Sequence, residues 1–263
     1  FILTFIATLA QVEMGIFEAK KYFFEGVFVY LPIGNFNVPI FFSGYTFGVI
    51  MLINLCCAHF KRFVFKWSKI GIWLIHIGLI ILIVGSGIIS SYTVESQVSL
   101  EEGQSKNYTQ SVILNELVVL ESIDDENDRV FSYPESLLAE NSLLTHDDLP
   151  FVIEPISYFV NSTIGRVPEG IQSIASQGLG SEMIVTPRPK SFNDKERNMP
   201  SSHLEIFYDN KSLGVWTVSA LLAVEQSLGT INGKDYRIAL RPKRYYLDFN
   251  LKLNEFSHDK YIG

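Results

Sequence analysis

Two long stretches without any Asp, Glu, Lys or Arg constrain this chain more than any other feature. They run from Gly26 to Ala58 and from Ile70 to Val94. A helix needs roughly 20 apolar residues to cross the hydrocarbon core of a bilayer, so each stretch is long enough for one crossing. From about Glu95 onward the composition is that of a soluble domain. The sequence therefore predicts a multi-pass α-helical membrane protein with a separate domain outside the bilayer.

The chain also begins inside an apolar run, Phe1 to Ala10. Because no basic segment precedes this run and no small-residue cleavage site follows it, we interpret it as the end of a first span rather than as a signal peptide. The chain stops at Gly263 without the signs of a domain ending. We therefore expect a fragment that lacks its start and its later spans.

The loop between the two charge-free stretches sets the expected orientation. It holds four Lys or Arg and no acid, and short loops of this kind stay in the cytoplasm. The domain after the last span is then extracytoplasmic, and periplasmic in a two-membrane bacterium. The predicted segments are the end of a first transmembrane helix at 1–16, a periplasmic loop at 17–38, a transmembrane helix at 39–58, a cytoplasmic basic loop at 59–69, a transmembrane helix at 70–91 and a periplasmic β-rich domain at 92–263.

The outer domain is predicted to be rich in β-strands. Apolar and polar residues alternate over 247–254, which is typical of a half-buried strand. Asn232-Gly233 between two apolar runs predicts a tight hairpin turn. The remaining segments are predicted as a second hairpin at 203–208 and 213–218, further strands at 112–120 and 151–160, and loops at 123–149 and 186–202.

Several functions lack support in the sequence. The adjacent Cys56 and Cys57 are too close for an ordinary disulfide, and we interpret them as small apolar helix residues. No Cys-x-x-Cys-His motif is present for covalent haem attachment. There is no Gly-rich phosphate loop, catalytic-triad spacing or paired-carboxylate motif, and the net negative charge outside the basic loop argues against nucleic acid.

His76 is the residue most indicative of chemistry. It lies six residues past Ile70, or about 9 Å along a helix, in the cytoplasmic half of the expected hydrocarbon layer. An ionisable side chain at that depth is costly and is a functional candidate by default. Trp73 and Ile80 lie near its own face of the helix. The opposite face has a seam for close helix packing, formed by Gly71, Gly78 and Gly85.

The spacing of His76 leaves two interpretations open. Haem iron suits a single neutral imidazole, because haem is largely apolar and histidine is a common axial ligand. The plainer interpretation is a hydrogen bond between helices, to Asn54 or to a Ser or Thr. A zinc site would need more ligands. His59 is expected to be solvated at the membrane edge, and surface or structural roles are expected for His146, His203 and His258.

Four segments have an order and spacing that match a known family. They are Gln11 to Tyr30 after the first span, Gly71 to Gly87 with His76, the turn Glu101-Glu-Gly-Gln104, and Ala239 to Gly263 with its Asp259-Lys-Tyr261-Ile-Gly263 ending. In these segments the chain resembles the ResB/CcsB family of system II cytochrome c biogenesis, and most closely the amino-terminal half of fused CcsBA proteins. Residues 105 to 230 add little to this resemblance.

The resemblance implies a haem exporter joined to a haem lyase, the holocytochrome c synthase, in the bacterial inner membrane. Haem b would enter from the cytoplasmic side and be held non-covalently between histidines of two membrane helices. At an external site it would be attached to the reduced Cys-x-x-Cys-His thiols of an apocytochrome c. The implied partners are therefore haem, apocytochrome c, thiol-reducing proteins and membrane lipid, with no nucleic acid.

Site residues follow from the same resemblance. His76 would be one axial ligand of the haem iron, with Trp73 and Ile80 as haem contacts. The second membrane histidine, the external histidines and a tryptophan-rich segment would come from a CcsA-like half, fused or separate. Nothing in this chain matches that half, so lyase activity is expected only together with it, and no catalytic residue is assigned.

Two other functions compete with haem handling. One is a membrane-tethered periplasmic binding or scaffolding module without haem, in which His76 merely bonds a neighbouring residue. The other is a b-type cytochrome, which would need paired histidines in its spans. His59 lies outside the expected span at 39–58, so the sequence does not supply that pair.

Overall fold

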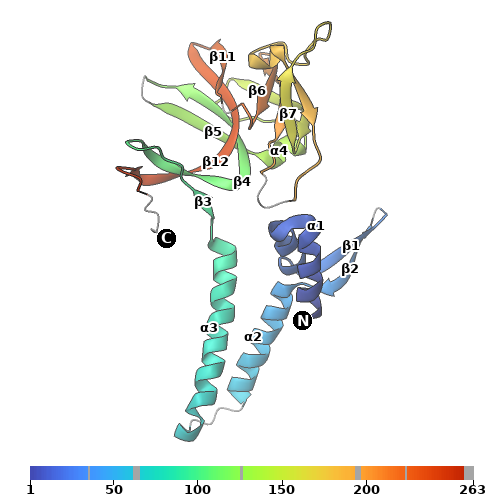
Figure 1. The fold of residues 1–263 in the computed structure, drawn as a ribbon, viewed down its shortest axis with the longest axis vertical. Coiled ribbons are helices and arrows are strands. Elements are labelled where there is room, and N and C mark those ends of the chain that lie inside the picture. Colours follow the sequence, from blue (N-terminus) through green and yellow to red (C-terminus); the bar gives the residue numbers. More distant parts are fainter. Residues whose placement is uncertain (35, 62–65, 125–126, 193–196, 223, 258–263) are drawn as a thin grey trace, which may run out of the picture. The chain divides into compact units, whose positions relative to one another are not determined.

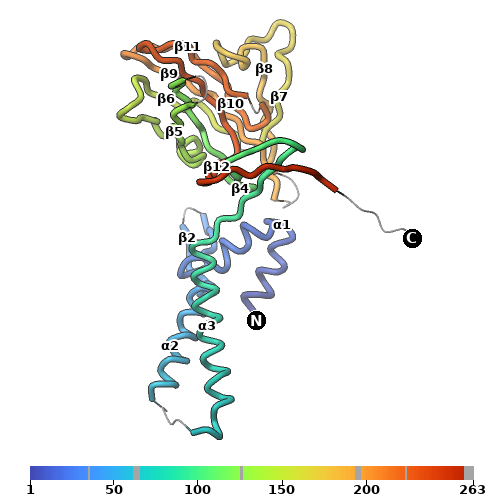
Figure 2. The backbone as a smooth tube through the Cα atoms, turned by 90° about the vertical axis from the view of Figure 1, so that its left-hand side faces the viewer, coloured from blue at the N-terminus to red at the C-terminus, as the bar shows by residue number. Residues whose placement is uncertain are grey.

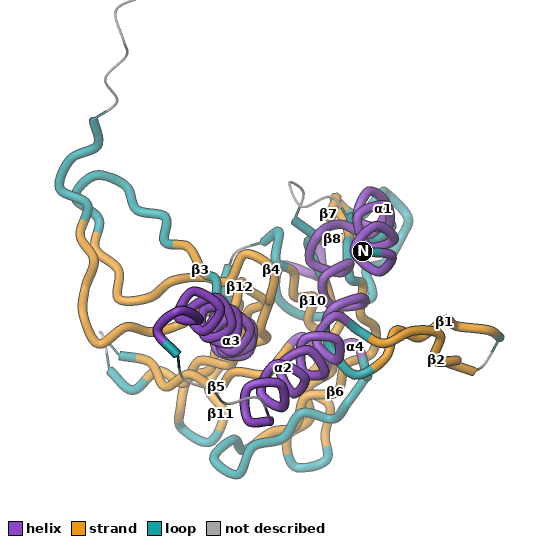
Figure 3. Tube along the Cα trace, turned by 90° about the horizontal axis from the view of Figure 1, so that it is seen from below, coloured by secondary structure: helices purple, strands orange, loops and turns teal. Residues whose placement is uncertain are grey.

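A computed structural model describes the chain except for residues 35, 62–65, 125–126, 193–196, 223 and 258–263. The chain divides into two compact units. The first is built mainly from Phe1–Val94, and the second from Glu95–Ser191 and Arg197–Gly263. Figure 3 shows the contrast between them: the first unit is mainly helical, with one hairpin, and the second is built from strands joined by loops.

The helical unit contains three helices of membrane-spanning character (Figure 1). They are α1 (Ile2–Phe24), α2 (Gly44–Lys61) and α3 (Ile70–Tyr92), the last preceded by a short 3₁₀ turn, η1 (Trp67–Lys69). All three are long and apolar enough to cross a bilayer. No side chain of α2 or α3 is buried within the structure, so their apolar surfaces are open to lipid or to other protein. The prediction of membrane-type helices joined to a β-rich part is confirmed at this level.

A break at Gly15 divides α1. This residue has φ 76° and ψ 163°, a conformation that glycine adopts without a steric penalty. The helix resumes after it and ends at Phe24 (Figure 2). The first span predicted at 1–16 thus stops close to a real change of direction, but helical structure continues eight residues beyond it.

A β-hairpin follows α1 where the sequence predicts a loop. The segment 17–38, predicted as an outer loop between spans, contains the end of α1, all of β1 (Phe28–Ile33) and the start of β2 (Phe36–Phe42). Aromatic and β-branched residues favour this extended backbone. Side-chain bonds tie the hairpin to α2: Ser43 Oγ donates to the Gly26 carbonyl at 2.5 Å, and Thr46 Oγ1 donates to the Val27 carbonyl at 2.7 Å. The helix predicted at 39–58 accordingly begins only at Gly44.

The second unit is built from antiparallel strands (Figure 1). Its two larger sheets have the strand orders β10-β9-β6 and β11-β12-β4-β3, with β5 also paired to β4. The elements are β3 (Ser96–Gln97), β4 (Ser105–Ser122), β5 (Asp128–Pro134), α4 (Glu135–Ala139), β6 (Phe151–Phe159), β7 (Ser162–Arg166), η2 (Leu179–Glu182), β8 (Met183–Pro187), β9 (Ser201–Tyr208), β10 (Lys211–Ser219), β11 (Gln226–Ile231) and β12 (Lys234–Lys252). Strands β7 and β8 form a separate hairpin.

Both larger sheets contribute to one hydrophobic core. Fully buried side chains come from β4 and β12 on one side and from β6, β9 and β10 on the other, including Leu117, Ile153, Leu204, Val218, Ile238 and Leu240. The alternation of apolar and polar residues places one face of each strand against this core. The second unit therefore has its own core and does not depend on the helices for its hydrophobic contacts.

Both predicted hairpins are present, with the backbone that their turn residues favour. Asn232 and Gly233 join β11 to β12 with φ of 54° and 81°. Asp209 and Asn210 join β9 to β10 with φ of 49° and 58°. Two consecutive left-handed residues match the twist of the flanking strands, which explains the preference for Asn, Asp and Gly here.

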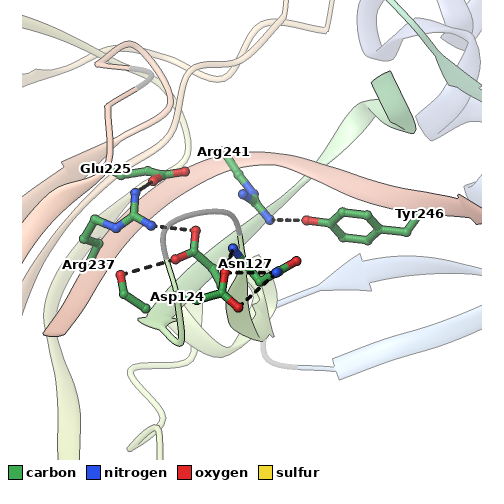
Figure 4. Close-up of polar contacts among 8 residues, drawn as sticks. Asp124, Asn127, Glu225, Arg237, Arg241 and Tyr246 are labelled. Carbon is green, nitrogen blue, oxygen red and sulfur yellow. Dashed lines mark hydrogen bonds and ion pairs between the residues drawn. The ribbon is translucent and has the colours of Figure 1, made fainter. Parts of the chain in front are cut away.

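The loop prediction for 123–149 is wrong in its middle part. That segment forms β5 and α4, although it is acidic and polar overall. Phe131, Tyr133 and Leu138 are buried in the core, and this alternation outweighs the polar composition. Arg237 of β12 supports the same region by bonding Asp128 at the start of β5 and Glu225 before β11, each at 2.5 Å (Figure 4).

Candidate functional site

His59 and His76 face each other where α2 and α3 meet. Their ring centroids are 5.5 Å apart, with 48° between the ring planes. His59 lies two residues before the end of α2, and His76 lies six residues after the start of α3. The short connection between the helices makes them antiparallel neighbours (Figures 1 and 2). The last turn of α2 therefore lies beside the first turns of α3, and this brings the two imidazoles together.

The orientation of His76 is fixed by its own helix. Its Nδ1 lies 2.7 Å from the backbone carbonyl oxygen of Ile72. A carbonyl oxygen can only accept, so Nδ1 carries the proton and donates it, and Nε2 keeps its lone pair. Metal-binding histidines are commonly held in this way, with one ring nitrogen bonded to a backbone carbonyl and the other directed at the metal. The bond across to Asn54 considered above is not among the contacts of the described residues.

His59 is half-buried and not fully solvated as predicted. Its ring packs edge-on against Trp73, with centroids 4.1 Å apart and 74° between the planes. Its Nε2 atom is buried and has no hydrogen-bond partner among the residues that the structure describes. A buried nitrogen without a partner costs about 1–3 kcal/mol, which makes this atom a candidate for binding a ligand.

Trp73 and Ile80 complete what we call the two-histidine site, defined as His59, Trp73, His76 and Ile80. Both side chains are half-buried. Trp73 lies about one helical turn before His76, and Ile80 lies about one turn after it, so they flank it on the same side of α3. The site thus combines two imidazoles with one flat aromatic and one branched apolar surface.

The glycine seam of α3 has no neighbour within the described residues. A Cβ atom placed at Gly71, Gly78 or Gly85 meets nothing within 4 Å. The hairpin of α2 and α3 consequently packs through the face that carries His76 and not through the seam. The close helix packing predicted at these glycines has no partner in the described part of the chain.

The two-histidine site suits a metal ion whose remaining ligands are not supplied by the protein. Among the described residues, no group of three or more His, Cys, Asp or Glu side chains could hold a metal ion. Structural zinc sites use four protein ligands, whereas haem iron needs only one or two axial ligands because the porphyrin supplies the rest. Two facing imidazoles in an apolar setting fit the second requirement.

Neither His146 nor His203 belongs to a group of side chains that could hold a metal ion in the described part of the chain. His146 accepts a hydrogen bond on Nδ1 from the Asp148 backbone N–H at 3.1 Å. His203 of β9 is 3% exposed, and its Nδ1 lies 2.9 Å from Thr217 Oγ1. Burial lowers the pKa of His203 below its ordinary 6.5, because the charged imidazole would lose its hydration. His258 lies outside the described residues.

His203 should make the second unit less stable in acid. The unfolded chain takes up a proton at the ordinary pKa of 6.5, while the folded His203 resists it, so stability is lost as pH falls below 6.5 toward the folded pKa. The slope from this group is at most about 1.4 kcal/mol per pH unit. We expect the free energy of urea unfolding, measured between about pH 5 and pH 8, to fall in acid in the wild-type protein. His203→Asn should remove this part of the pH dependence. Equal slopes in both proteins would contradict this prediction.

Comparison with known proteins identifies no relative: no protein-family model matches the chain, and no curated protein matches it. The fold and site define only a broad class. The chain carries three helices that are long and apolar enough to cross a membrane, a β-rich unit, and two histidines that face each other between two of those helices.

Proposed function

We propose that this chain acts in cytochrome c biogenesis, as part of a haem exporter and haem lyase in which His76 binds the haem. The observation that carries the proposal is the imidazole of His76 in a membrane-type helix, with Nδ1 2.7 Å from the Ile72 carbonyl oxygen. Under the proposal, Nε2 is the nitrogen that binds iron. Haem is here a cargo, held non-covalently and passed on. The order and spacing of the four segments that resemble the ResB/CcsB family support the same conclusion.

The residues around His76 each have a part in this proposal. Nε2 of His76 donates its lone pair to the iron, which accepts an axial ligand. Trp73 and Ile80 offer apolar surface to the porphyrin on the same side of α3. His76 keeps its orientation without help from haem, because the Ile72 carbonyl already holds the ring.

The proposed location is the bacterial inner membrane, with three crossings by the residues of this chain and the β-rich unit in the periplasm. Support comes from the hydropathy of the three helices and from the basic residues between α2 and α3, which favour a cytoplasmic position. The two-histidine site is near that connection, so it would receive haem from the cytoplasmic side.

Attachment of haem requires partners. The proposed partners are a CcsA-like half, an apocytochrome c with a Cys-x-x-Cys-His motif, and proteins that keep its thiols reduced. We propose that the β-rich unit docks the apocytochrome or supports the lyase half. Deletion of the unit with full retention of haem attachment would contradict that role.

The absorption spectrum of the full-length protein tests the proposal. Protein purified from membranes in mild detergent is expected to show a Soret band, from haem that acidified acetone extracts because it is not covalently bound. A protein without haem, isolated from cells that make haem in excess, would contradict the proposal. The chain would then be better described as a membrane-tethered binding or scaffolding module.

A further inference from the structure

We propose that a bulge in strand β4 inserts its apolar side chains into the lipid headgroup layer beside the end of the third span. The β4 bulge is defined as residues 111–114. This inference goes beyond the proposed function, because the contact is with membrane lipid and requires neither haem nor another half of the protein.

The β4 bulge is an insertion in the pairing of β4 with β12. Asn115 pairs with Pro242, and Gln110 pairs with Arg244. The residues between Gln110 and Asn115 therefore stand opposite Lys243 alone. An insertion of this kind bends the strand and directs side chains away from the regular pleat.

Three consecutive apolar side chains are exposed on the bulge. Val112, Ile113 and Leu114 are 44%, 49% and 48% exposed, between the buried residues Ser111 and Asn115. Ser111 Oγ stabilises this backbone by accepting hydrogen bonds from the N–H of Ile113 at 3.3 Å and of Leu114 at 3.0 Å. Single exposed apolar residues are ordinary, but a run of three is unfavourable in water unless something covers it. The β4 bulge is therefore suited to an apolar partner.

The chain itself holds the bulge close to the bilayer. Helix α3 ends at Tyr92, and β3 begins four residues later at Ser96. Ser96 pairs directly with Ser111, the first residue of the bulge. Four residues extend at most about 14 Å, and paired residues lie about 5 Å apart, so the bulge begins within about 20 Å of the end of the span. Membrane lipid is thus an apolar partner within its reach.

Positive charge flanks the β4 bulge. Lys243 lies opposite it on β12, Arg244 follows, and Lys106 lies nearer the start of β4. Glu116, the first acid after the bulge on β4, forms an ion pair with Arg241 and is not free to oppose these charges. Basic side chains close to a span are attracted to anionic lipid headgroups. The charge therefore favours anionic lipid as the partner.

Tyrosine rings lie beside the same basic groups. The guanidinium carbon of Arg244 is 4.2 Å from the ring centroid of Tyr108, and Lys106 Nζ is 5.9 Å from it. Lys243 Nζ is 5.4 Å from the ring centroid of Tyr245. Tyrosine is enriched at the membrane–water interface, and the long stems of Lys and Arg suit the same layer. The surroundings of the bulge thus have the composition of an interfacial segment.

Fluorescence quenching of the full-length protein in lipid vesicles tests the inference. Cys56→Ser and Cys57→Ser remove the native thiols, and Ile113→Cys then carries one fluorophore. Ile123→Cys is the matched control, because Ile123 is an exposed apolar residue just beyond the other end of β4. The vesicles contain phosphatidylethanolamine and phosphatidylglycerol, with or without bromine on the upper acyl chains, and iodide is the quencher in water.

We expect brominated lipid to quench the label at Ile113 at least about twofold, because interfacial segments reach about 5–10 Å into the boundary of headgroups and acyl chains. Iodide should quench this label weakly, and the label at Ile123 should show the opposite pattern. Leu114→Cys is a second position in the bulge and should repeat the result for Ile113, which guards against a distortion caused by one label.

Quenching by iodide and not by lipid at both bulge positions would overturn the inference. Quenching by neither would also overturn it, because the bulge would then be covered by protein, such as a second copy of this chain. The measurement is made on protein without haem as well as with it. Its failure is therefore distinct from a protein that never binds haem, which would contradict the proposed function.

Discussion

Replacement of His76 by alanine is expected to remove the haem band from the purified protein, and added imidazole is expected to restore it. The variant loses the nitrogen that binds iron but keeps Trp73 and Ile80, so a space remains that free imidazole can enter. The measurement is the absorption spectrum at equal protein concentration, before and after addition of imidazole.

His146→Ala is the control for this prediction, since it removes a histidine of the β-rich unit whose ring contacts Phe131. Its haem band should equal that of the wild-type protein. An unchanged spectrum in His76→Ala would assign His76 a structural role and bring the scaffolding function forward. Loss without rescue by imidazole, in a variant that purifies in normal yield, would also argue against axial ligation.

Replacement of Glu116 by alanine is expected to destabilise the β-rich unit by about 3–5 kcal/mol. Glu116 of β4 forms an ion pair with Arg241 of β12 at 3.0 Å, and their side chains are only 5% and 7% exposed. The carboxylate also accepts bonds from the Arg244 N–H at 3.2 Å and from Ser132 Oγ at 2.6 Å. Without Glu116, the Arg241 guanidinium stays buried with only its 3.3 Å bond to the Tyr246 hydroxyl (Figure 4) among the described residues.

The matched control breaks an exposed ion pair in the same unit. Arg129 and Asp148 are 2.6 Å apart, with side chains 48% and 49% exposed. Asp148→Ala should cost less than about 1 kcal/mol, because water screens the charges. Urea titration measures the free energy of unfolding of both variants. Hydrogen exchange of the β4 and β12 amides shows whether the loss lies in this sheet pair. Similar losses in the two variants would show that burial of Arg241 does not govern the stability of this sheet pair.

The helices were predictable because hydropathy alone determines where a chain can cross a bilayer. The residues at which the helices begin and end were harder to predict. The continuation of α1 past Gly15 depends on a single glycine at positive φ, and the start of α2 depends on the bonds of Ser43 and Thr46 to the backbone before β1. Local composition predicts neither end. The first depends on the backbone conformation of one glycine, and the second arises from contacts between segments.

In the β-rich unit, turn chemistry was the most reliable signal. The Asn232-Gly233 and Asp209-Asn210 turns need left-handed backbone, and these residue types adopt it at low cost. Strand β5 was missed because Phe131 and Tyr133 lie in an acidic segment. Their burial is decided by pairing with β4, a contact that the segment itself does not reveal.

At the site, His76 could be predicted because a histidine in a long apolar stretch is unusual. The contact between His59 and His76 was not predicted, because the sequence assigned His59 to a solvated basic loop. Helix α2 in fact continues through Lys61, and the ring of His59 lies beside that of His76 on α3. The pairing follows from the antiparallel packing of the two helices, which becomes visible only once their ends are known.

The most direct measurement of the central claim is covalent haem on c-type cytochromes in cells. Cells that lack the native protein would receive either the wild-type full-length protein or His76→Ala, and haem-dependent peroxidase staining of denatured cytochromes would be compared. We predict staining with the wild-type protein, little or none with His76→Ala, and recovery with imidazole. Full staining in the absence of the protein, or with His76→Ala expressed at the same level, would contradict the claim.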